Sequence, residues 1–422
     1  MKLVFSTFTI CCMPLLSVAV DNSPAARPDA IRVCEAGGRA TVGPEPYFVL
    51  AKDFNGDGIS DLAVANRGTL KPPSETRPGN DTISILLGRG DGTFQPKVDY
   101  LVGFAPYTIE SGDFNEDGAI DLAVVCFQSH DGRDVALLRG EGNGLFHEAT
   151  FLRVDGEHIY NKSLLANGEP LYARPGLTSL VVVDVNGDRH EDIVAVAWSS
   201  DFIVTFHGDG NGNFPRQFVT RETPLGPRDV AGHDFDGDEN IDLVLTHYSG
   251  DRISLWRGDG TGRFTKQADF PCGGRTPYHF EVADLNRDGK VDLLVGNRGA
   301  SDDISIFVGE GGFQFTLLGS YSAGTANGPD QTEYEIRDVA VVDLDEDGKL
   351  EIFAACRRAN RVVIWRLHVA ANGPVIRAVG EYVLKDGGPR AFAVADFDGD
   401  GKTELAVALA TQGSVTLLRA AK

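Results

Sequence analysis

The sequence predicts an all-β protein, and three observations lead to that prediction. The chain contains 50 glycines and only 2 methionines, a balance that favours tight turns, because glycine destabilises helices and readily adopts positive φ angles. An acidic loop recurs seven times, and each copy lies between short apolar runs rich in Val, Ile and aromatic residues. Because each repeat supplies four such strands, the expected architecture is a seven-bladed β-propeller of four-stranded blades.

The N-terminus has the pattern of an export signal. Lys2 precedes an uncharged apolar run from residue 3 to residue 20, and Ala19 places a small residue where a signal peptidase cleaves. A membrane anchor is the alternative, but Pro14 and several Ser and Thr residues disfavour a spanning helix. We therefore expect a secreted protein, extracellular or periplasmic, with no membrane insertion after signal cleavage. The chain divides into a signal peptide at 1–19, a short linker at 20–33 and a propeller at 34–422.

The charge balance limits the classes of partner. Lys and Arg total 39 against 61 Asp and Glu, which gives a net charge of −22. Nucleic acids and anionic membrane surfaces attract basic proteins, so this balance argues against both. It favours cationic partners instead.

The cysteines argue against a disulfide framework. Four remain after the signal, at Cys34, Cys126, Cys272 and Cys356. Cys126 and Cys356 end apolar strand patterns in well separated repeats, which is typical of small buried side chains, so we expect no essential disulfide.

Seven copies of one acidic loop organise the chain. Each copy carries oxygen-bearing side chains at positions 1, 3, 5 and 9. The copies begin at Asp53, Asp113, Asp184, Asp234, Asp284, Asp343 and Asp396, and they read DFNGDGISD, DFNEDGAID, DVNGDRHED, DFDGDENID, DLNRDGKVD, DLDEDGKLE and DFDGDGKTE. Repetition at intervals close to those of propeller repeats, roughly 40 to 50 residues, indicates one supersecondary unit copied seven times.

Each loop lies in the same order of short strands. An apolar run such as YFVLAKD enters the loop, a second such as DLAVAN leaves it, and a third such as TISILLG follows a polar turn. Turns such as GRGDGTF then lead into a fourth, more polar strand. The seventh repeat ends after its third strand at Leu418, whereas residues before the first loop align with fourth strands elsewhere. We therefore expect an N-terminal strand to complete the last blade and remove an open sheet edge.

The loop chemistry indicates calcium. Ca²⁺ takes six to eight oxygen ligands, and alternate Asp or Asn side chains plus the carbonyl at position 7 can surround one point. An EF-hand would place a Glu at position 12, which is apolar here, so the loop must join two strands. The predicted ligands at positions 1, 3, 5, 7 and 9 are Asp53, Asn55, Asp57, Ile59 and Asp61; Asp113, Asn115, Asp117, Ala119 and Asp121; Asp184, Asn186, Asp188, His190 and Asp192; Asp234, Asp236, Asp238, Asn240 and Asp242; Asp284, Asn286, Asp288, Lys290 and Asp292; Asp343, Asp345, Asp347, Lys349 and Glu351; and Asp396, Asp398, Asp400, Lys402 and Glu404.

Up to seven calcium ions would relieve the crowding of these carboxylates, which repel one another by about 1 to 4 kcal/mol per close pair. A metal-free Asx turn is the alternative. The sharp turn at position 6 favours glycine, and Arg189 and Glu239 replace it in loops three and four, so we expect weaker calcium binding there.

These loops, with the strand that follows and the G-D-G-x-F hairpins, resemble the FG-GAP or VCBS repeat family, whose blades also build the head of integrin α subunits. The resemblance spans about residues 34 to 422. It implies a seven-bladed propeller with calcium held between the first and second strands of each blade. Integrin heads keep such loops in only some blades, so this chain is more similar to secreted bacterial repeat proteins.

A second set of residues recurs six positions before each loop. It consists of Tyr47, Tyr107, Thr178, Arg228, Tyr278, Arg337 and Arg390. The repeat places these side chains around the mouth of the central channel, opposite the metals, together with Asn66, Arg67, Trp198, His247, Tyr248, Asn297, Arg298 and Arg358 from nearby loops. Arg pairs with carboxylates and Tyr stacks on sugars, so the ring suits an anionic or glycan ligand. Alternatively, the arginines pair with Asp229 and Asp338, and the tyrosines only pack the blades.

No HExxH, GxSxG or phosphate-binding loop is present, so a catalytic role has little support from the sequence. We predict a secreted, monomeric, calcium-binding propeller that serves as a binding or adhesion module for carbohydrate or protein. Two alternatives stay open: an enzyme similar to polysaccharide lyases, with its site among the Arg and Tyr side chains of the mouth, and a purely structural scaffold.

Overall fold

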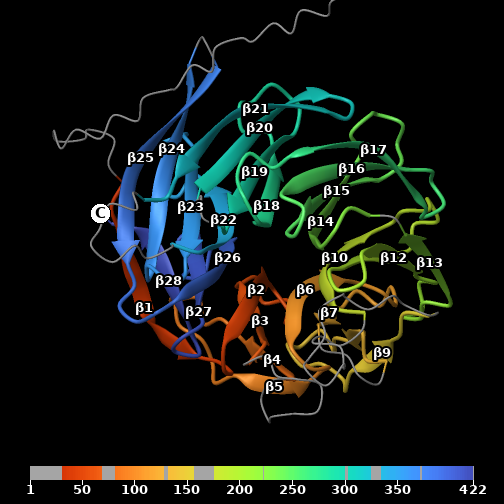
Figure 1. The fold of residues 1–422 in the computed structure, drawn as a ribbon. Coiled ribbons are helices and arrows are strands. Elements are labelled where there is room, and N and C mark those ends of the chain that lie inside the picture. The colour runs from red at the N-terminus through yellow and green to blue at the C-terminus, as the bar shows by residue number, and fades with distance from the viewer. Residues whose placement is uncertain are drawn as a thin grey trace, which may run out of the picture.

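The computed structural model describes residues 31–68, 81–127, 132–155, 175–221, 223–299, 303–324, 334–370 and 373–421. Within these residues the regular elements are 28 strands, arranged as seven four-stranded antiparallel sheets around a central axis (Figure 1). The predicted all-β, seven-bladed propeller is therefore confirmed. The predicted signal peptide at 1–19 and the linker up to residue 30 lie outside the described residues. The described residues form no helix that is long and apolar enough to cross a membrane.

Each blade places its first strand beside the channel and its fourth at the outer rim (Figure 1). Blades one to three contain β2 (Pro46–Lys52), β3 (Asp61–Asn66), β4 (Thr82–Leu86), β5 (Val98–Leu101), β6 (Pro106–Gly112), β7 (Asp121–Cys126), β8 (Val135–Leu138), β9 (Thr150–Leu152), β10 (Leu177–Val183), β11 (Asp192–Ala197), β12 (Phe202–His207) and β13 (Arg216–Arg221). Blades four to six contain β14 (Pro227–His233), β15 (Asp242–His247), β16 (Arg252–Gly258), β17 (Phe264–Pro271), β18 (Pro277–Ala283), β19 (Asp292–Asn297), β20 (Asp303–Gly311), β21 (Gln314–Ser322), β22 (Ile336–Val342), β23 (Glu351–Cys356), β24 (Arg361–Ala370) and β25 (Gly373–Val383).

The two ends of the chain share blade seven. This blade contains β26 (Pro389–Ala395), β27 (Glu404–Leu409), β28 (Ser414–Ala420) and β1 (Val33–Thr41). β1 pairs antiparallel with β28, with Val33 opposite Ala420 and Thr41 opposite Ser414. The N-terminal strand therefore closes the ring as predicted, and it covers the edge that β28 would otherwise expose.

The second strand of every blade forms the core. All six residues of β3, DLAVAN, are buried, and the same holds for the corresponding strand of each other blade. Blades stack face to face, so a second strand is covered on both sides; Ala63 and Ile83 of blade one pack with Leu122 and Val124 of blade two. This double coverage explains why the sequence shows continuous apolar runs instead of alternation.

Three of the four cysteines that follow the predicted signal peptide are buried, and Cys34 is partly buried. Cys34, Cys126, Cys272 and Cys356 are all free, and Cys126 and Cys356 end buried second strands. This arrangement agrees with small buried side chains at the ends of second strands.

Acidic loops and an arginine–tyrosine pocket as candidate sites

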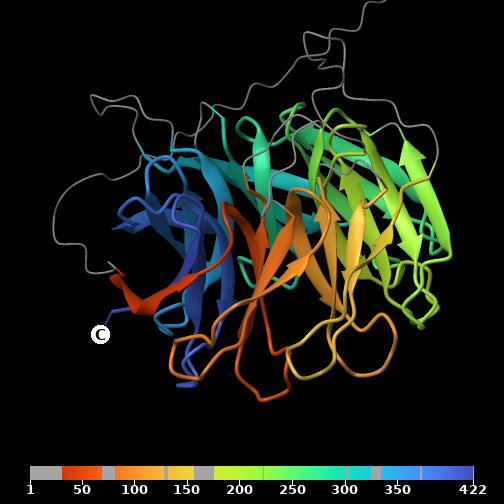
Figure 2. The same cartoon turned by 90° about the horizontal axis from the view of Figure 1, so that it is seen from below.

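The acidic loops join the first and second strands of the blades, such as β2 and β3 in blade one. First strands all run the same way along the channel, so the acidic loops emerge at one face of the propeller (Figure 2). The residues six positions before each loop, called the ring positions from here on, lie near the starts of the first strands and so toward the other face. The two predicted sets of functional residues are therefore separated by the length of the first strands.

The carboxylate at position 1 organises each loop by accepting backbone hydrogen bonds. In loop one, Asp53 Oδ1 accepts from Gly56 N at 2.8 Å and Asp53 Oδ2 accepts from Gly58 N at 2.8 Å. The side chain at position 3 adds a further bond, because Asn55 Oδ1 accepts from Asp57 N at 3.0 Å. These bonds are those of an Asx turn, so the loop has a defined backbone before any ion is considered.

The carboxylate at position 9 is buried and ties the loop to the third strand. Asp61 Oδ2 accepts from Phe54 N at 2.9 Å, and Asp61 Oδ1 accepts from Gly88 N at 2.7 Å, just beyond β4. A Cβ at residue 88 would lie 2.5 Å from the carbonyl oxygen of Ser60, which explains the glycine. Burial raises the pKa of Asp61 to about 6, although these two hydrogen bonds oppose the shift. This structural role was not foreseen from the sequence, although the recurring glycine after the third strand signals it.

The loops also contact the neighbouring blade. Gly144, in the hairpin of blade two, donates its N–H to Phe54 O of loop one at 3.1 Å. Gly212 in blade three repeats this bond to Phe114 O at 2.8 Å, and Gly92 repeats it to Phe397 O at 3.2 Å across the closure of the ring. Anything that fixes an acidic loop therefore also steadies the interface between two blades.

Loops three and four keep the common turn despite the missing glycine at position 6. Arg189 has φ 74° and Glu239 has φ 69°, close to the 82° of Gly58. A residue with a Cβ in this conformation costs about 1 to 2 kcal/mol. The two loops therefore carry strain but present their position 1 and position 5 side chains on the same backbone.

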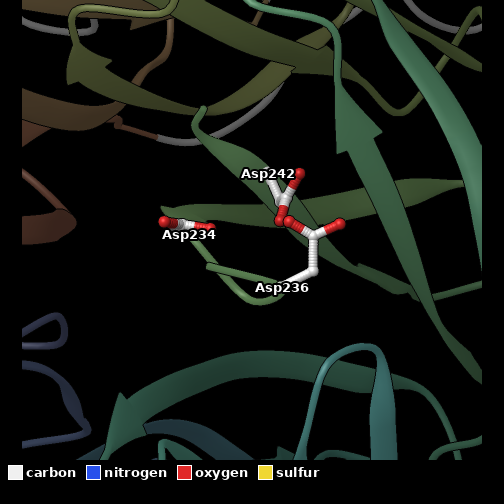
Figure 3. A group of neighbouring side chains, drawn as sticks. All are labelled: Asp234, Asp236 and Asp242. Atoms are coloured by element: carbon white, nitrogen blue, oxygen red, sulfur yellow. The ribbon is translucent and has the colours of Figure 1, made fainter. Parts of the chain in front are cut away.

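Three loops bring at least three carboxylates together. Within each group the candidate ligand atoms lie within 4.8 Å of one another, and the groups are Asp234, Asp236 and Asp242; Asp343, Asp345 and Asp347; and Asp396, Asp398 and Glu404. Figure 3 shows the first group, whose carboxylates converge from the two ends of loop four. Asp236 Oδ1 is buried and has no hydrogen-bond partner among the described residues. An all-oxygen donor set with a buried free oxygen fits Ca²⁺, a hard ion that oxygen ligands hold at about 2.3 to 2.6 Å.

The ring positions at the opposite end coincide with bulges in the first strands. In blade one Pro46 pairs with Asn66 and Phe48 pairs with Ala65, so Tyr47 between them has no partner in the second strand. The same shift leaves Arg228, Tyr278 and Arg390 without a cross-strand partner in their blades. A residue with positive φ precedes the bulge by two positions, as at Glu45 (φ 50°). Bulges re-aim side chains, which explains why one position per blade reaches the channel mouth.

Tyrosine rings and guanidinium groups interleave there. Tyr47 and Tyr107 stack with their centroids 4.1 Å apart, and the Tyr47 and Tyr278 hydroxyls hydrogen-bond to each other. Arg390 lies 3.8 Å from the centroid of Tyr47, and Arg228 lies 4.2 Å from that of Tyr278. Burial raises the pKa of Tyr278, but Arg228, Arg337 and Arg390 outweigh it and hold that pKa well below its usual value.

Positive charge exceeds negative charge in this cluster. The side chain of Arg390 is 1% exposed, and none of its three nitrogens makes a hydrogen bond within the described part of the chain. Its nearest carboxylate is that of Glu45, at 3.8 Å. Burial and the neighbouring Arg67 lower the pKa of Arg390 to about 10. Glu335, in contrast, is one carboxylate shared by several arginines, including Arg298 and Arg337.

Most predicted ring residues line one pocket of about 300 Å³. Its walls are formed by Tyr47, Arg67, Tyr107, Phe127, Thr178, Trp198, Arg228, Tyr248, Tyr278, Arg298 and Arg337. Arg390 lines an adjoining smaller space with His279. Asn66 and His247, predicted nearby, instead serve the fold: Asn66 Oδ1 accepts from Gly43 N at 3.0 Å, and His247 is bonded to Ser254.

The expected alternative, in which the arginines pair with acids such as Asp229 and Asp338, is borne out for Arg337, although its partner is Glu335. Asp229 and Asp338 have another neighbour. Both acids flank His279, with Asp338 Oδ1 2.5 Å from Nδ1 and Asp229 Oδ2 3.6 Å from Nε2. Sequence reasoning missed Glu45 and Glu335 as the acids of the mouth, although each stands two residues before a ring position.

Comparison with known proteins agrees with the fold and with the repeat. The FG-GAP-like repeat matches residues 53–124, 184–244, 234–295, 284–354 and 343–407. Cartilage acidic protein 1 of Mus musculus is 30% identical over 131 residues, which are 29% of this chain and 19% of that protein. The chain thus matches about a fifth of that relative's length.

Solved structures share the architecture at low identity. A putative 6-phosphogluconolactonase from Bacteroides uniformis has a TM-score of 0.56 and 16% identity, over 83% of this chain and 88% of that one. The periplasmic gluconolactonase PpgL of Pseudomonas aeruginosa has a TM-score of 0.55 and 17% identity, over 86% of this chain and 88% of that one. BBS1N, solved in complex with ARL6DN, has a TM-score of 0.54 and 12% identity, over 92% of this chain and 96% of that one. Identities this low support the propeller fold alone.

Proposed function

Because the chain belongs to the FG-GAP-like repeat family, we propose that it is a secreted, calcium-binding propeller that serves as a binding or adhesion module. Its ligand is a carbohydrate or protein that carries a carboxylate, and this group enters the arginine–tyrosine pocket. Calcium in the acidic loops stabilises the blades at the other face and does not touch the ligand.

Buried Arg390 is the observation that carries this proposal. A buried guanidinium without hydrogen bonds is costly, because desolvation of the charge is not repaid by a partner. A ligand carboxylate in the pocket would offset this charge through space, while Arg228 and Arg337, which line the pocket, would donate the N–H···O bonds. The surrounding Arg67, Arg228 and Arg337 make the pocket positive in a chain whose net charge is −22.

The walls and size of the pocket fit one sugar unit or one acidic side chain. A volume of about 300 Å³ is at the lower end for ligand pockets. Trp198 and Tyr248 line the pocket with partly exposed aromatic rings, which can pack on the apolar face of a sugar ring. The arginines would then bind the carboxylate, and the aromatic rings would pack against the sugar.

Binding to oligogalacturonate and to an uncharged galactose oligomer of equal length tests the proposal by calorimetry. We expect the wild type to bind the acidic oligomer, and Arg390→Met to weaken binding at least tenfold. Arg139→Met is the matched control, because Arg139 is exposed beside acidic loop two, and it should bind as the wild type does. Equal affinity for the two oligomers, or no effect of Arg390→Met, would contradict a carboxylate site.

An enzyme that cleaves acidic polysaccharides is the second candidate. The lowered pKa of Tyr278 favours it, since a phenolate beside three arginines can accept a proton from a substrate. Ultraviolet absorbance from new unsaturated ends during the same incubation would support the enzyme, whereas retention of an intact oligomer supports the binding module.

A further inference from the structure

The acidic loops differ in the residue that faces them from the third strand. The cross-strand register pairs Glu351 with Arg366 in blade six, and extending the register by one residue in the other blades places one side chain opposite each position 9 carboxylate. This residue is Leu87, Arg139, His207, Arg257, Val308, Arg366 and Arg419 in blades one to seven. Loops four, six and seven have Asp at position 3 and face an arginine, whereas of the four loops with Asn at position 3 only loop two does.

Arg366 of β24 inserts into loop six. Its Nε donates to Glu351 Oε1 at 2.7 Å, its Nη2 donates to Asp345 Oδ2 at 2.5 Å, and its Nη1 donates to Asp347 Oδ2 at 3.1 Å. The Arg366 side chain is 4% exposed. One guanidinium thus contacts three of the four carboxylates that the sequence assigns to a calcium ion.

The arginines of blades four and seven lie differently. Arg257 reaches Asp236 Oδ2 at 2.6 Å and Asp238 Oδ2 at 3.1 Å, and Arg419 reaches Asp398 Oδ2 at 3.4 Å. Both side chains are 47% exposed, and neither has a contact with the position 9 carboxylate within the described part of the chain. Asp242 and Glu404 accordingly belong to the carboxylate groups of loops four and seven, whereas Glu351 is absent from that of loop six.

From these contacts we propose that Arg366 is a built-in cation that replaces calcium in loop six. The inference rests on the proposed calcium binding of the other loops. A divalent ion would need the oxygens that Arg366 already holds on Asp345 and Glu351, and it would be repelled by the guanidinium a few ångström away. The planar fork of five N–H donors satisfies several carboxylates at once, as a single metal ion would.

Blade six also departs from blades one to five at the residue that follows the one opposite position 9. In blades one to five the second oxygen of the position 9 carboxylate accepts from a glycine N–H, such as Gly88 N or Gly140 N at 2.7 and 2.8 Å. In blade six Leu367 replaces this glycine and donates to Leu350 O at 3.0 Å, and Arg366 supplies the bond to Glu351 Oε1 instead. The long strand β24 thus positions Arg366 in the loop.

Calcium stoichiometry by native mass spectrometry of the full chain tests the proposal. Asp343→Asn removes a position 1 carboxylate from loop six and should leave the number of bound ions unchanged, whereas the matched Asp53→Asn in loop one should lower it by one. Arg366→Leu frees the loop six oxygens, including Asp345 Oδ1, which is buried and unpartnered, so the count should rise by one. Arg139→Leu, at the corresponding position of blade two, should leave it unchanged.

Hydrogen exchange gives a second readout that does not depend on how the Arg366 variant folds. Chelation should speed exchange of the Gly58 amide in wild-type loop one and leave that of Gly348 in loop six unchanged. A loss of one ion in Asp343→Asn, or equal loss of protection at Gly348 and Gly58, would overturn the proposal while calcium binding by the propeller stands. A protein that binds no calcium at all would overturn both.

Discussion

Two buried arginines at opposite faces of the ring show how the same side chain can be fully paired or left in need of a partner. Arg366 at the acidic face contacts three carboxylates, whereas Arg390 at the mouth makes no hydrogen bond and lies 3.8 Å from its nearest acid. The acidic face has an excess of carboxylates, and the mouth has an excess of guanidinium groups. This difference is the basis for proposing cation sites at one face and an anion site at the other.

Removal of calcium should have the largest effect on stability, and this effect should arise at the acidic face and not at the mouth. Chelation should lower the melting temperature substantially, since each site filled at 100 times its Kd contributes about 2.7 kcal/mol and several loops lose their ion together. Thermal unfolding with calcium and with chelator measures this effect. An unchanged melting temperature would mean that the Asx turns hold the acidic face without metal.

A pair of variants separates the structural and the metal-binding carboxylates of loop one. Asp61→Ala should cost about 3 kcal/mol or more with or without calcium, because the N–H groups of Phe54 and Gly88 lose their acceptor in a buried place. Asp57→Ala should cost about 2 to 3 kcal/mol in calcium and under about 1 kcal/mol in chelator, since Asp57 is exposed. Denaturant unfolding in both buffers provides the four values, and equal losses for the two variants in chelator would contradict the division of roles.

Replacing each of the two arginines with methionine sharpens their comparison. In chelator, Arg366→Met should lower the unfolding free energy by about 3 kcal/mol, because three carboxylates lose their partner. Arg390→Met should leave it unchanged or raise it by about 1 to 2 kcal/mol, since removing a buried charge without hydrogen bonds outweighs the lost contact with Tyr47 and the long ion pair with Glu45. A loss above about 1 kcal/mol in Arg390→Met would show that this arginine is a structural element.

The pH dependence of stability reports on the mouth as well. Burial opposes protonation of His279, but Asp338 and Asp229 outweigh it and raise its pKa to about 10, above the unfolded value near 6.5. A raised folded pKa stabilises the protein fully below pH 6.5 or so, and this contribution is lost as the pH rises through about 10. The melting temperature of the wild type should therefore fall more than that of His279→Gln over this range. Parallel pH profiles would contradict a charged His279 in the fold.

Features that repeat in every blade could be predicted from the sequence. The acidic loops, the four strands and the ring positions such as Tyr47 and Arg228 recur at fixed offsets, and circular closure follows because the seventh repeat lacks a fourth strand and the N-terminus supplies one. Features that depend on which strands face each other could not. Arg366 meets Asp345 only through the register of β23 and β24, and Glu335 meets Arg298 only through the curvature of the ring. Arg390 looked equivalent to Arg337, and only the structure shows that Arg337 hydrogen-bonds a carboxylate, that of Glu335, whereas Arg390 has only a long ion pair with Glu45.

Anomalous diffraction from crystals grown in calcium tests the central claim most directly, because it locates each ion. The account predicts anomalous peaks among the carboxylates of acidic loops such as loop one and loop four, and none at the arginine–tyrosine pocket. A map without peaks in any acidic loop, at saturating calcium, would contradict it.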